Sequence, residues 1–113
     1  MIKQESAQAR NMSEESILLD AGYHHLMEKK YDQAVLFYKK VLAINPDNAL
    51  AHFNMGVIHE QKGETILAMK SYQKVIALNP DTIIEESNDP NKIGTTLIDW
   101  ARENLDRLDK KRQ

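Results

Sequence analysis

Histidine is the side chain in this sequence best suited to bind a divalent metal or to transfer a proton near neutral pH. His52 and His59 lie seven residues apart, which places both on one face of a helix, and His25 precedes His59 by 34 residues. No cysteine or carboxylate joins these histidines at the spacing of a metal site. We therefore expect no bound metal, no other cofactor and no histidine-based catalysis.

Adjacent acidic residues are the second candidate for a catalytic site, because one carboxylate of a pair can act as general acid and the other as general base. Glu14 and Glu15 are sequence neighbours, as are Glu85 and Glu86. Neighbours on a helix diverge by about 100° and cannot flank one substrate bond. The sequence also has no phosphate-binding glycine loop, zinc-protease motif or Gly-x-Ser-x-Gly elbow. These observations predict a protein that is not an enzyme.

Composition and charge narrow the classes of partner. The 113 residues are 42% hydrophobic and 28% charged, as in an ordinary soluble domain. The net charge of −2 provides no broad basic surface, so we expect no nucleic-acid partner, and the basic tail Lys110 to Arg112 is interpreted as a favourable helix C-terminus. No signal peptide or membrane-length apolar run is present, which predicts a cytoplasmic protein without a membrane partner.

An internal repeat dominates the sequence. Residues 15–48 laid over residues 49–82 give ten identities in 34 positions. The matched pairs are Gly22/Gly56, His25/His59, Ala34/Ala68, Tyr38/Tyr72, Lys40/Lys74, Val41/Val75, Ala43/Ala77, Asn45/Asn79, Pro46/Pro80 and Asp47/Asp81. A period of this size is typical of stacked helical units.

Each repeat is predicted to contain two helices, because its apolar residues recur every three or four positions. Ser13 is expected to cap the first helix, and each Asn-Pro-Asp triplet to end a second helix. Glycine within a helix costs about 1 kcal/mol relative to alanine, so Gly22 and Gly56 indicate a close helix crossing. We expect Ala34 and Ala68 to supply the small residue that faces each glycine.

These positions resemble the tetratricopeptide repeat, in which large apolar, small, glycine, aromatic, alanine and proline residues follow at set intervals. The residues that carry the resemblance are Leu18, Ala21, Gly22, His25, Ala34, Tyr38, Val41 and Pro46 in the first unit, and His52, Met55, Gly56, His59, Ala68, Tyr72, Val75 and Pro80 in the second. Histidine at 25, 52 and 59 and valine at 41 and 75 depart from the family pattern. The resemblance implies an all-α fold of antiparallel helix-turn-helix pairs in a short right-handed superhelix.

The repeat does not continue a third time, because Asp89 and Pro90 occupy its small and glycine positions. We instead expect a C-terminal capping helix with Asp89 as its cap and Pro90 in its first turn. Its apolar stripe is predicted to consist of Ile93, Leu97, Trp100, Ala101, Leu105 and Leu108. The predicted organisation is a polar segment (1–12), two repeats (13–82), a linker loop (83–91) and an amphipathic capping helix with a basic tail (92–113).

In proteins of this family, the first helices of the repeats line a concave surface that binds a peptide or protein segment. The resemblance implies a site formed by Leu19, Tyr23, Leu26, Phe53, Asn54 and Val57. Asn54 matches an asparagine that hydrogen-bonds the ligand backbone in many relatives. The same groove could instead be covered by the N-terminal segment or the C-terminal helix.

Two other functions compete with this adaptor or scaffold role. The chaperone carboxylate clamp is disfavoured, because its positions read Leu19, Tyr23, Asn54, Ile84 and Asn88 and lack the required cations. A structural subunit that self-associates through the ends of the array or the C-terminal helix is the alternative, since two repeats are fewer than a stable array usually needs. The predicted partners are thus a protein or peptide and, in the alternative, a second copy.

Overall fold

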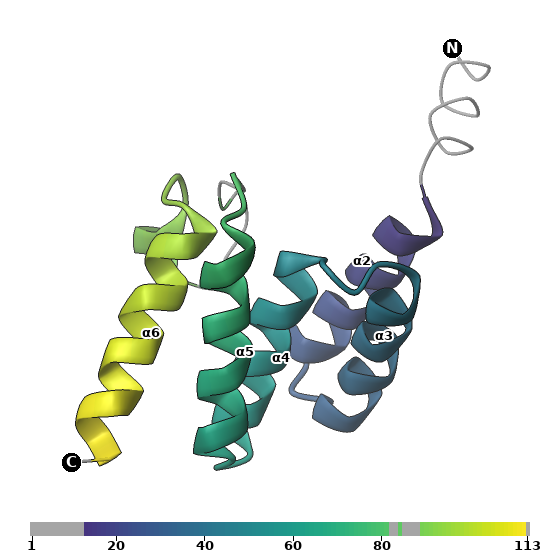
Figure 1. The fold of residues 1–113 in the computed structure, drawn as a ribbon. Helices are drawn as coiled ribbons and strands as arrows, with labels where there is room; N and C mark the ends of the chain where they lie inside the picture. The colour runs from purple at the N-terminus through teal and green to yellow at the C-terminus, as the bar shows by residue number, and fades with distance from the viewer. Residues whose placement is uncertain (1–12, 82–83, 85–88, 113) are drawn as a thin grey trace. The chain divides into compact units, whose positions relative to one another are not determined.

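The computed structural model describes residues 13–81, 84 and 89–112, and the predicted polar segment 1–12 lies outside them. The described chain consists of α-helices and one 3-10 turn, joined by short connections, as the all-α prediction requires. It divides into two compact units, one formed by the described residues up to Pro46 and one by the described residues from Asp47 onward. Figure 1 shows the helices of each unit. The right-handed superhelix stays a prediction.

The first unit is a helical hairpin formed by α2 (Glu14–Met27) and α3 (Tyr31–Ile44). The Ser13 hydroxyl accepts a hydrogen bond from the backbone N–H of Ser16 at 3.0 Å, which confirms the predicted cap. The connection turns at Lys29, whose φ of +62° lies in the left-handed region. The hairpin then ends at Asn45, whose side-chain amide donates to the Glu15 carboxylate at 2.9 Å.

The second unit begins with the equivalent hairpin, α4 (Ala49–Gln61) and α5 (Thr65–Leu78). Asn48 caps α4 by accepting a hydrogen bond from the backbone N–H of Ala51 at 2.9 Å. Gly63 occupies the turn position equivalent to Lys29, with φ +77°. Glycine adopts this left-handed conformation without strain because it has no Cβ.

Both repeat glycines lie close to the second helix of their hairpin, and the nearest side chain is a tyrosine of that helix. A Cβ on Gly22 would lie 2.9 Å from Cε1 of Tyr38, and a Cβ on Gly56 would lie 2.7 Å from Cε1 of Tyr72. The glycines therefore make room for a buried tyrosine ring, which fills space between the two helices. The expected packing of Ala34 and Ala68 against the glycines stays a prediction.

The last helix begins later than predicted. Asp89 does cap a helical turn, but this is the 3-10 turn η1 (Pro90–Lys92), and α6 spans Leu97–Arg112. Gly94, with φ +89°, breaks the helical path, and its backbone N–H donates to the Ile84 carbonyl at 2.8 Å. The Thr96 hydroxyl then caps α6 through the N–H of Asp99. Ile93 consequently lies outside the apolar stripe and is 49% exposed.

The core of the second unit lies where α6 packs against α5, and Figure 1 shows these two helices side by side. Its buried members are Ala49, Phe53, Ala68, Met69, Tyr72, Val75, Leu97, Ala101 and Leu108. The predicted α6 stripe, apart from Ile93, contributes to this core. Of the helices that the structure describes, none is long and apolar enough to cross a membrane.

Candidate protein-binding site

The predicted site residues of the first unit all come from α2, but they differ in exposure. Leu19 and Tyr23 are half-buried and present part of their side chains at the surface. Leu26 is buried. Leu19 and Tyr23 are therefore the members of this set that retain surface for a ligand in the first unit.

In the second unit, the predicted site residues on α4 are buried or half-buried, and one of them, Phe53, lies beneath α6. Phe53 is only 2% exposed, and its ring centroid lies 4.9 Å from that of Trp100 on α6 and 5.4 Å from that of Tyr72 on α5. Asn54 is also buried, at 8% exposure. Val57 is half-buried and packs against the same core. The C-terminal helix thus covers Phe53, one of the two arrangements that the sequence left open.

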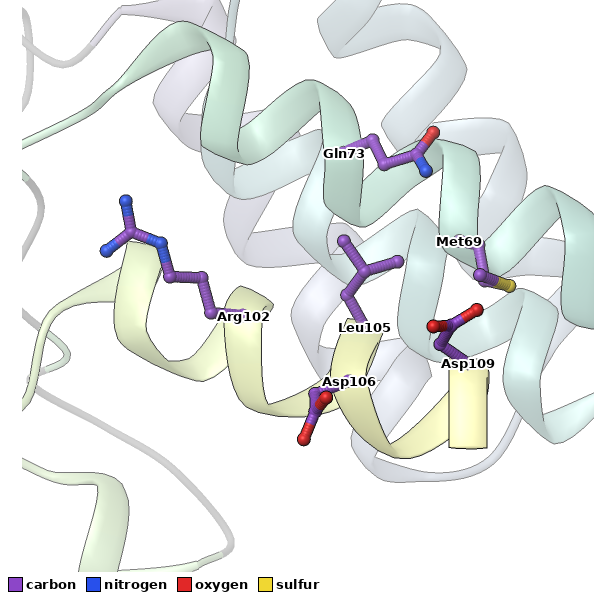
Figure 2. Close-up of a pocket in the computed structure, with 6 residues that line it drawn as sticks. All are labelled: Met69, Gln73, Arg102, Leu105, Asp106 and Asp109. Carbon is purple, nitrogen blue, oxygen red and sulfur yellow. The ribbon is translucent and has the colours of Figure 1, made fainter. Parts of the chain in front are cut away.

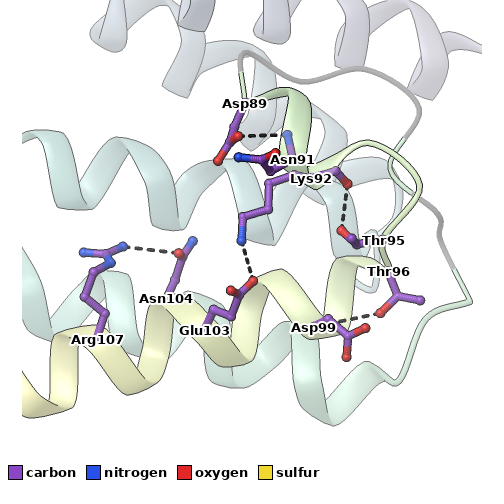
Figure 3. A network of polar contacts seen from close by, with 9 residues as sticks. All are labelled: Asp89, Asn91, Lys92, Thr95, Thr96, Asp99, Glu103, Asn104 and Arg107. Atoms are coloured by element: carbon purple, nitrogen blue, oxygen red, sulfur yellow. Dashed lines mark hydrogen bonds and ion pairs between the residues drawn. The ribbon is translucent and has the colours of Figure 1, made fainter.

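Trp100 supplies exposed aromatic surface where α6 covers α4, because its ring packs on Phe53 and remains partly exposed. The Lys92 ammonium lies 5.9 Å from the Trp100 ring centroid and pairs with the Glu103 carboxylate at 2.5 Å. Figure 3 shows Lys92 extending from η1 toward Glu103 on α6. We call the surface formed by Val57, Lys92, Trp100, Glu103 and Arg107 the α4–α6 face.

A polar network centred on Glu60 joins side chains of α4, α5 and α6. The Tyr72 hydroxyl donates to the Glu60 carboxylate at 2.5 Å, and the Arg107 guanidinium pairs with Glu60 at 2.8 Å. Arg107 also donates to the Asn104 side-chain oxygen at 3.2 Å, as Figure 3 shows. Each of α4, α5 and α6 contributes to this Glu60 network, which therefore fixes α6 on the hairpin.

The network also shifts the pKa values of Tyr72 and Arg107. Burial raises the pKa of Tyr72 well above its usual value, and the hydrogen bond to the Glu60 carboxylate raises it further. The bond to Glu60 also raises the pKa of Arg107. Tyr72 is accordingly a neutral donor and Arg107 a permanent cation at neutral pH, so the network stabilises the helix packing rather than transferring a proton.

Sequence reasoning did not identify Lys92, Glu60 or Arg107 as members of this region. One signal was present: Glu60 stands at the repeat position that Leu26 occupies, where a charged residue is unusual without a partner. The partner, Arg107, lies on the non-repeated helix, so the internal repeat could not indicate it. Trp100 belongs to the predicted apolar stripe of the C-terminal helix, and its contact with Phe53 confirms that it packs on the hairpin.

His25 and His59 each contact residues of their own repeat. The Nδ1–H of His25 donates to the Ala21 carbonyl at 2.8 Å, and the ring lies 5.1 Å from that of Phe37. His59 Nδ1 lies 2.8 Å from the Glu64 carboxylate. Among the side chains that the structure describes, no three histidine, aspartate or glutamate residues come together as a metal site requires.

Comparison with known families agrees with the helical architecture. A family model described as TPR repeat matches residues 25–63, and one described as Tetratricopeptide repeat matches residues 49–82, which contain α4 and α5. No curated protein matches the sequence. Together the two models cover 58 of the 113 residues. Because the matched segments contain the whole α4–α5 hairpin and both buried tyrosines, Tyr38 and Tyr72, the chain belongs to the tetratricopeptide repeat family.

Proposed function

We propose that the protein is a non-enzymatic adaptor that binds a segment of another protein through the first helices of its repeats. The α4–α6 face is the part of this site in the second unit. The observation that carries the proposal is the partly exposed Trp100 ring held against Phe53, with Lys92 beside it. We further propose that the protein acts in the cytoplasm.

The composition of the face supports binding. Tryptophan and arginine contribute a large share of the energy in protein interfaces, and the face contains both Trp100 and Arg107. Both are held in place, because Trp100 packs on Phe53 and Arg107 pairs with Glu60. Prior fixation of these side chains reduces the entropy that they lose on binding. The face is therefore preorganised for a ligand.

The predicted concave residues enter this proposal with different roles. Tyr23 of α2 occupies the repeat position of Val57, and Leu19 occupies that of Phe53. Both are partly exposed, so we propose that they contact the ligand directly. Leu26, Phe53 and Asn54 are buried and would shape the surface from beneath.

A charge exchange on the α4–α6 face tests the proposal without removing core contacts. The double variant Lys92→Glu with Glu103→Lys retains an ion pair but reverses the charge at each position. Peptides selected from a displayed random library on the native protein are expected to bind this variant at least about tenfold more weakly. Isothermal titration gives the dissociation constants.

The matched control is Glu28→Lys with Lys30→Glu, which exchanges an exposed pair of the first unit at 3.1 Å. Peptides that bind the face should bind this control as they bind the native protein. Equal binding to all three proteins would move the site away from the α4–α6 face, and failure to select any peptide would contradict the adaptor function itself.

A further inference from the structure

The opposite flank of α6 carries a groove that the proposed binding site does not use. The groove has a volume of about 350 Å³ and is lined by Met69 and Gln73 of α5 and by Arg102, Leu105, Asp106 and Asp109 of α6. Figure 2 shows these side chains along the two neighbouring helices. The α6 members recur every three or four residues, so they form one stripe, distinct from that of Trp100, Glu103 and Arg107.

The charges along this stripe are arranged with opposite signs at its two ends. Arg102 and Asp109 lie seven residues, or about two helical turns, apart, with Leu105 between them. Within the part of the chain that the structure describes, neither Arg102 nor Asp109 forms an ion pair, whereas Asp106 binds Lys110 of its own helix at 3.2 Å. The groove thus offers one cation and one anion to a ligand.

This arrangement is complementary to itself. When two copies of α6 pair in antiparallel orientation about a two-fold axis near Leu105 and Asp106, Arg102 of each copy lies opposite Asp109 of the other. The symmetry then produces two identical Arg–Asp pairs, which is the pattern of an isologous interface. Parallel pairing would instead place like charges together. We propose that this groove binds the same groove of a second copy of the chain.

Apolar contacts would accompany the two ion pairs. Leu105 and Met69 line the groove, and Ile66 lies three residues before Met69 on the adjoining surface of α5. Ile66 is 50% exposed, so burying it against a second copy removes apolar surface from water. The proposed dimer uses the flank of α6 away from α4, so it does not depend on the proposed function.

Complementary charge variants test this interface directly. Arg102→Asp places a second carboxylate opposite Asp109 in a dimer, and Asp109→Arg places a second guanidinium opposite Arg102. Each variant alone should therefore dimerise at least about tenfold more weakly than the native chain. When the two variants are mixed in equal amounts, the carboxylate introduced in one chain faces the guanidinium introduced in the other, and the native Arg102 and Asp109 face each other. The mixture should recover dimers, measured by sedimentation velocity from low micromolar to near-millimolar concentration.

The mixture distinguishes the proposed interface from other forms of association. A native chain that stays monomeric throughout this range overturns the proposal, as does a mixture that dimerises no better than the separate variants. Circular dichroism checks that both variants retain the native helix content. Lys92→Glu with Glu103→Lys should dimerise like the native chain, so loss of peptide binding and loss of dimerisation are separate results.

Discussion

Both repeats pack a tyrosine ring against a glycine between their two helices, but the residues around this glycine–tyrosine pair differ between the repeats. Gly22 admits the ring of Tyr38 in the first unit, and Gly56 admits the ring of Tyr72 in the second. Within the described residues, the second unit contains a further helix, α6, that packs on its hairpin, and the first unit consists of its hairpin. The shared positions thus build the hairpin, and the positions that differ determine what each hairpin can bind.

Two differing positions illustrate this division. Where the first repeat has the buried Leu26, the second has Glu60, which receives Tyr72 and Arg107. Where the first repeat has Leu19, the second has Phe53, whose ring packs against Trp100. Glu60 and Phe53 therefore both contact residues of α6. The comparison indicates that the second repeat has become the docking site of its own C-terminal helix.

Truncating the residue beneath α6 is expected to have the largest effect on this comparison. Phe53→Ala removes a buried ring from contact with both Trp100 and Tyr72, and should lower the free energy of unfolding by about 3–5 kcal/mol. Leu19→Ala at the equivalent, half-buried position should lower it by about 1–2 kcal/mol. Urea unfolding followed by circular dichroism measures both values, and equal losses would contradict the role of α6 as a cover.

Adding one methyl group at the shared crossing should have the next largest effect. Gly56→Ala brings a Cβ to within 2.7 Å of the Tyr72 ring, and this overpacking outweighs the roughly 1 kcal/mol that alanine gains as a helix former. We expect a net loss of about 1–2 kcal/mol in the free energy of unfolding, and a smaller loss for Gly22→Ala. In a Tyr72→Leu background the same substitution should be neutral or stabilising, since the ring is gone.

The sequence predicted the hairpins more fully than their contacts. The 34-residue period and Ser13 were sufficient for the helices and the first cap, because these depend on local spacing and local hydrogen bonds. The start of α6 was wrong because Gly94 adopts φ +89° while pairing with Ile84, a contact that no periodicity encodes. The covering of Phe53 and the pairing of Glu60 with Arg107 also join distant segments, so only the folded chain reveals them.

Alkaline pH should weaken the network that distinguishes the second repeat. The pKa of Tyr72 is raised on folding from its ordinary value of 10.0, so the neutral hydroxyl stabilises the fold fully below that pH. Above about pH 10 the unfolded chain loses this proton more readily, and stability should fall by up to about 1.4 kcal/mol per pH unit. Urea midpoints measured between about pH 9 and about pH 11 test this slope. Tyr72→Phe should be less stable than the native chain at neutral pH but should lack this part of the alkaline loss.

The smallest expected difference lies in the turns between paired helices, where the first repeat places a lysine in the backbone conformation that the second gives to glycine. Lys29 has φ +62° and Gly63 has φ +77°. A residue with a side chain loses about 1–2 kcal/mol in this region, and glycine's greater freedom in the unfolded chain offsets about 0.5–1 kcal/mol of that. Lys29→Gly should therefore stabilise the protein by about 0.5–1 kcal/mol, and Gly63→Lys should destabilise it by a similar amount.

Lys39→Gly, at an exposed position within α3, is the matched control and should destabilise by about 1 kcal/mol. If thermal unfolding shows Lys29→Gly shifting the midpoint downward as Lys39→Gly does, the left-handed turn is not the source of the difference between the two connections.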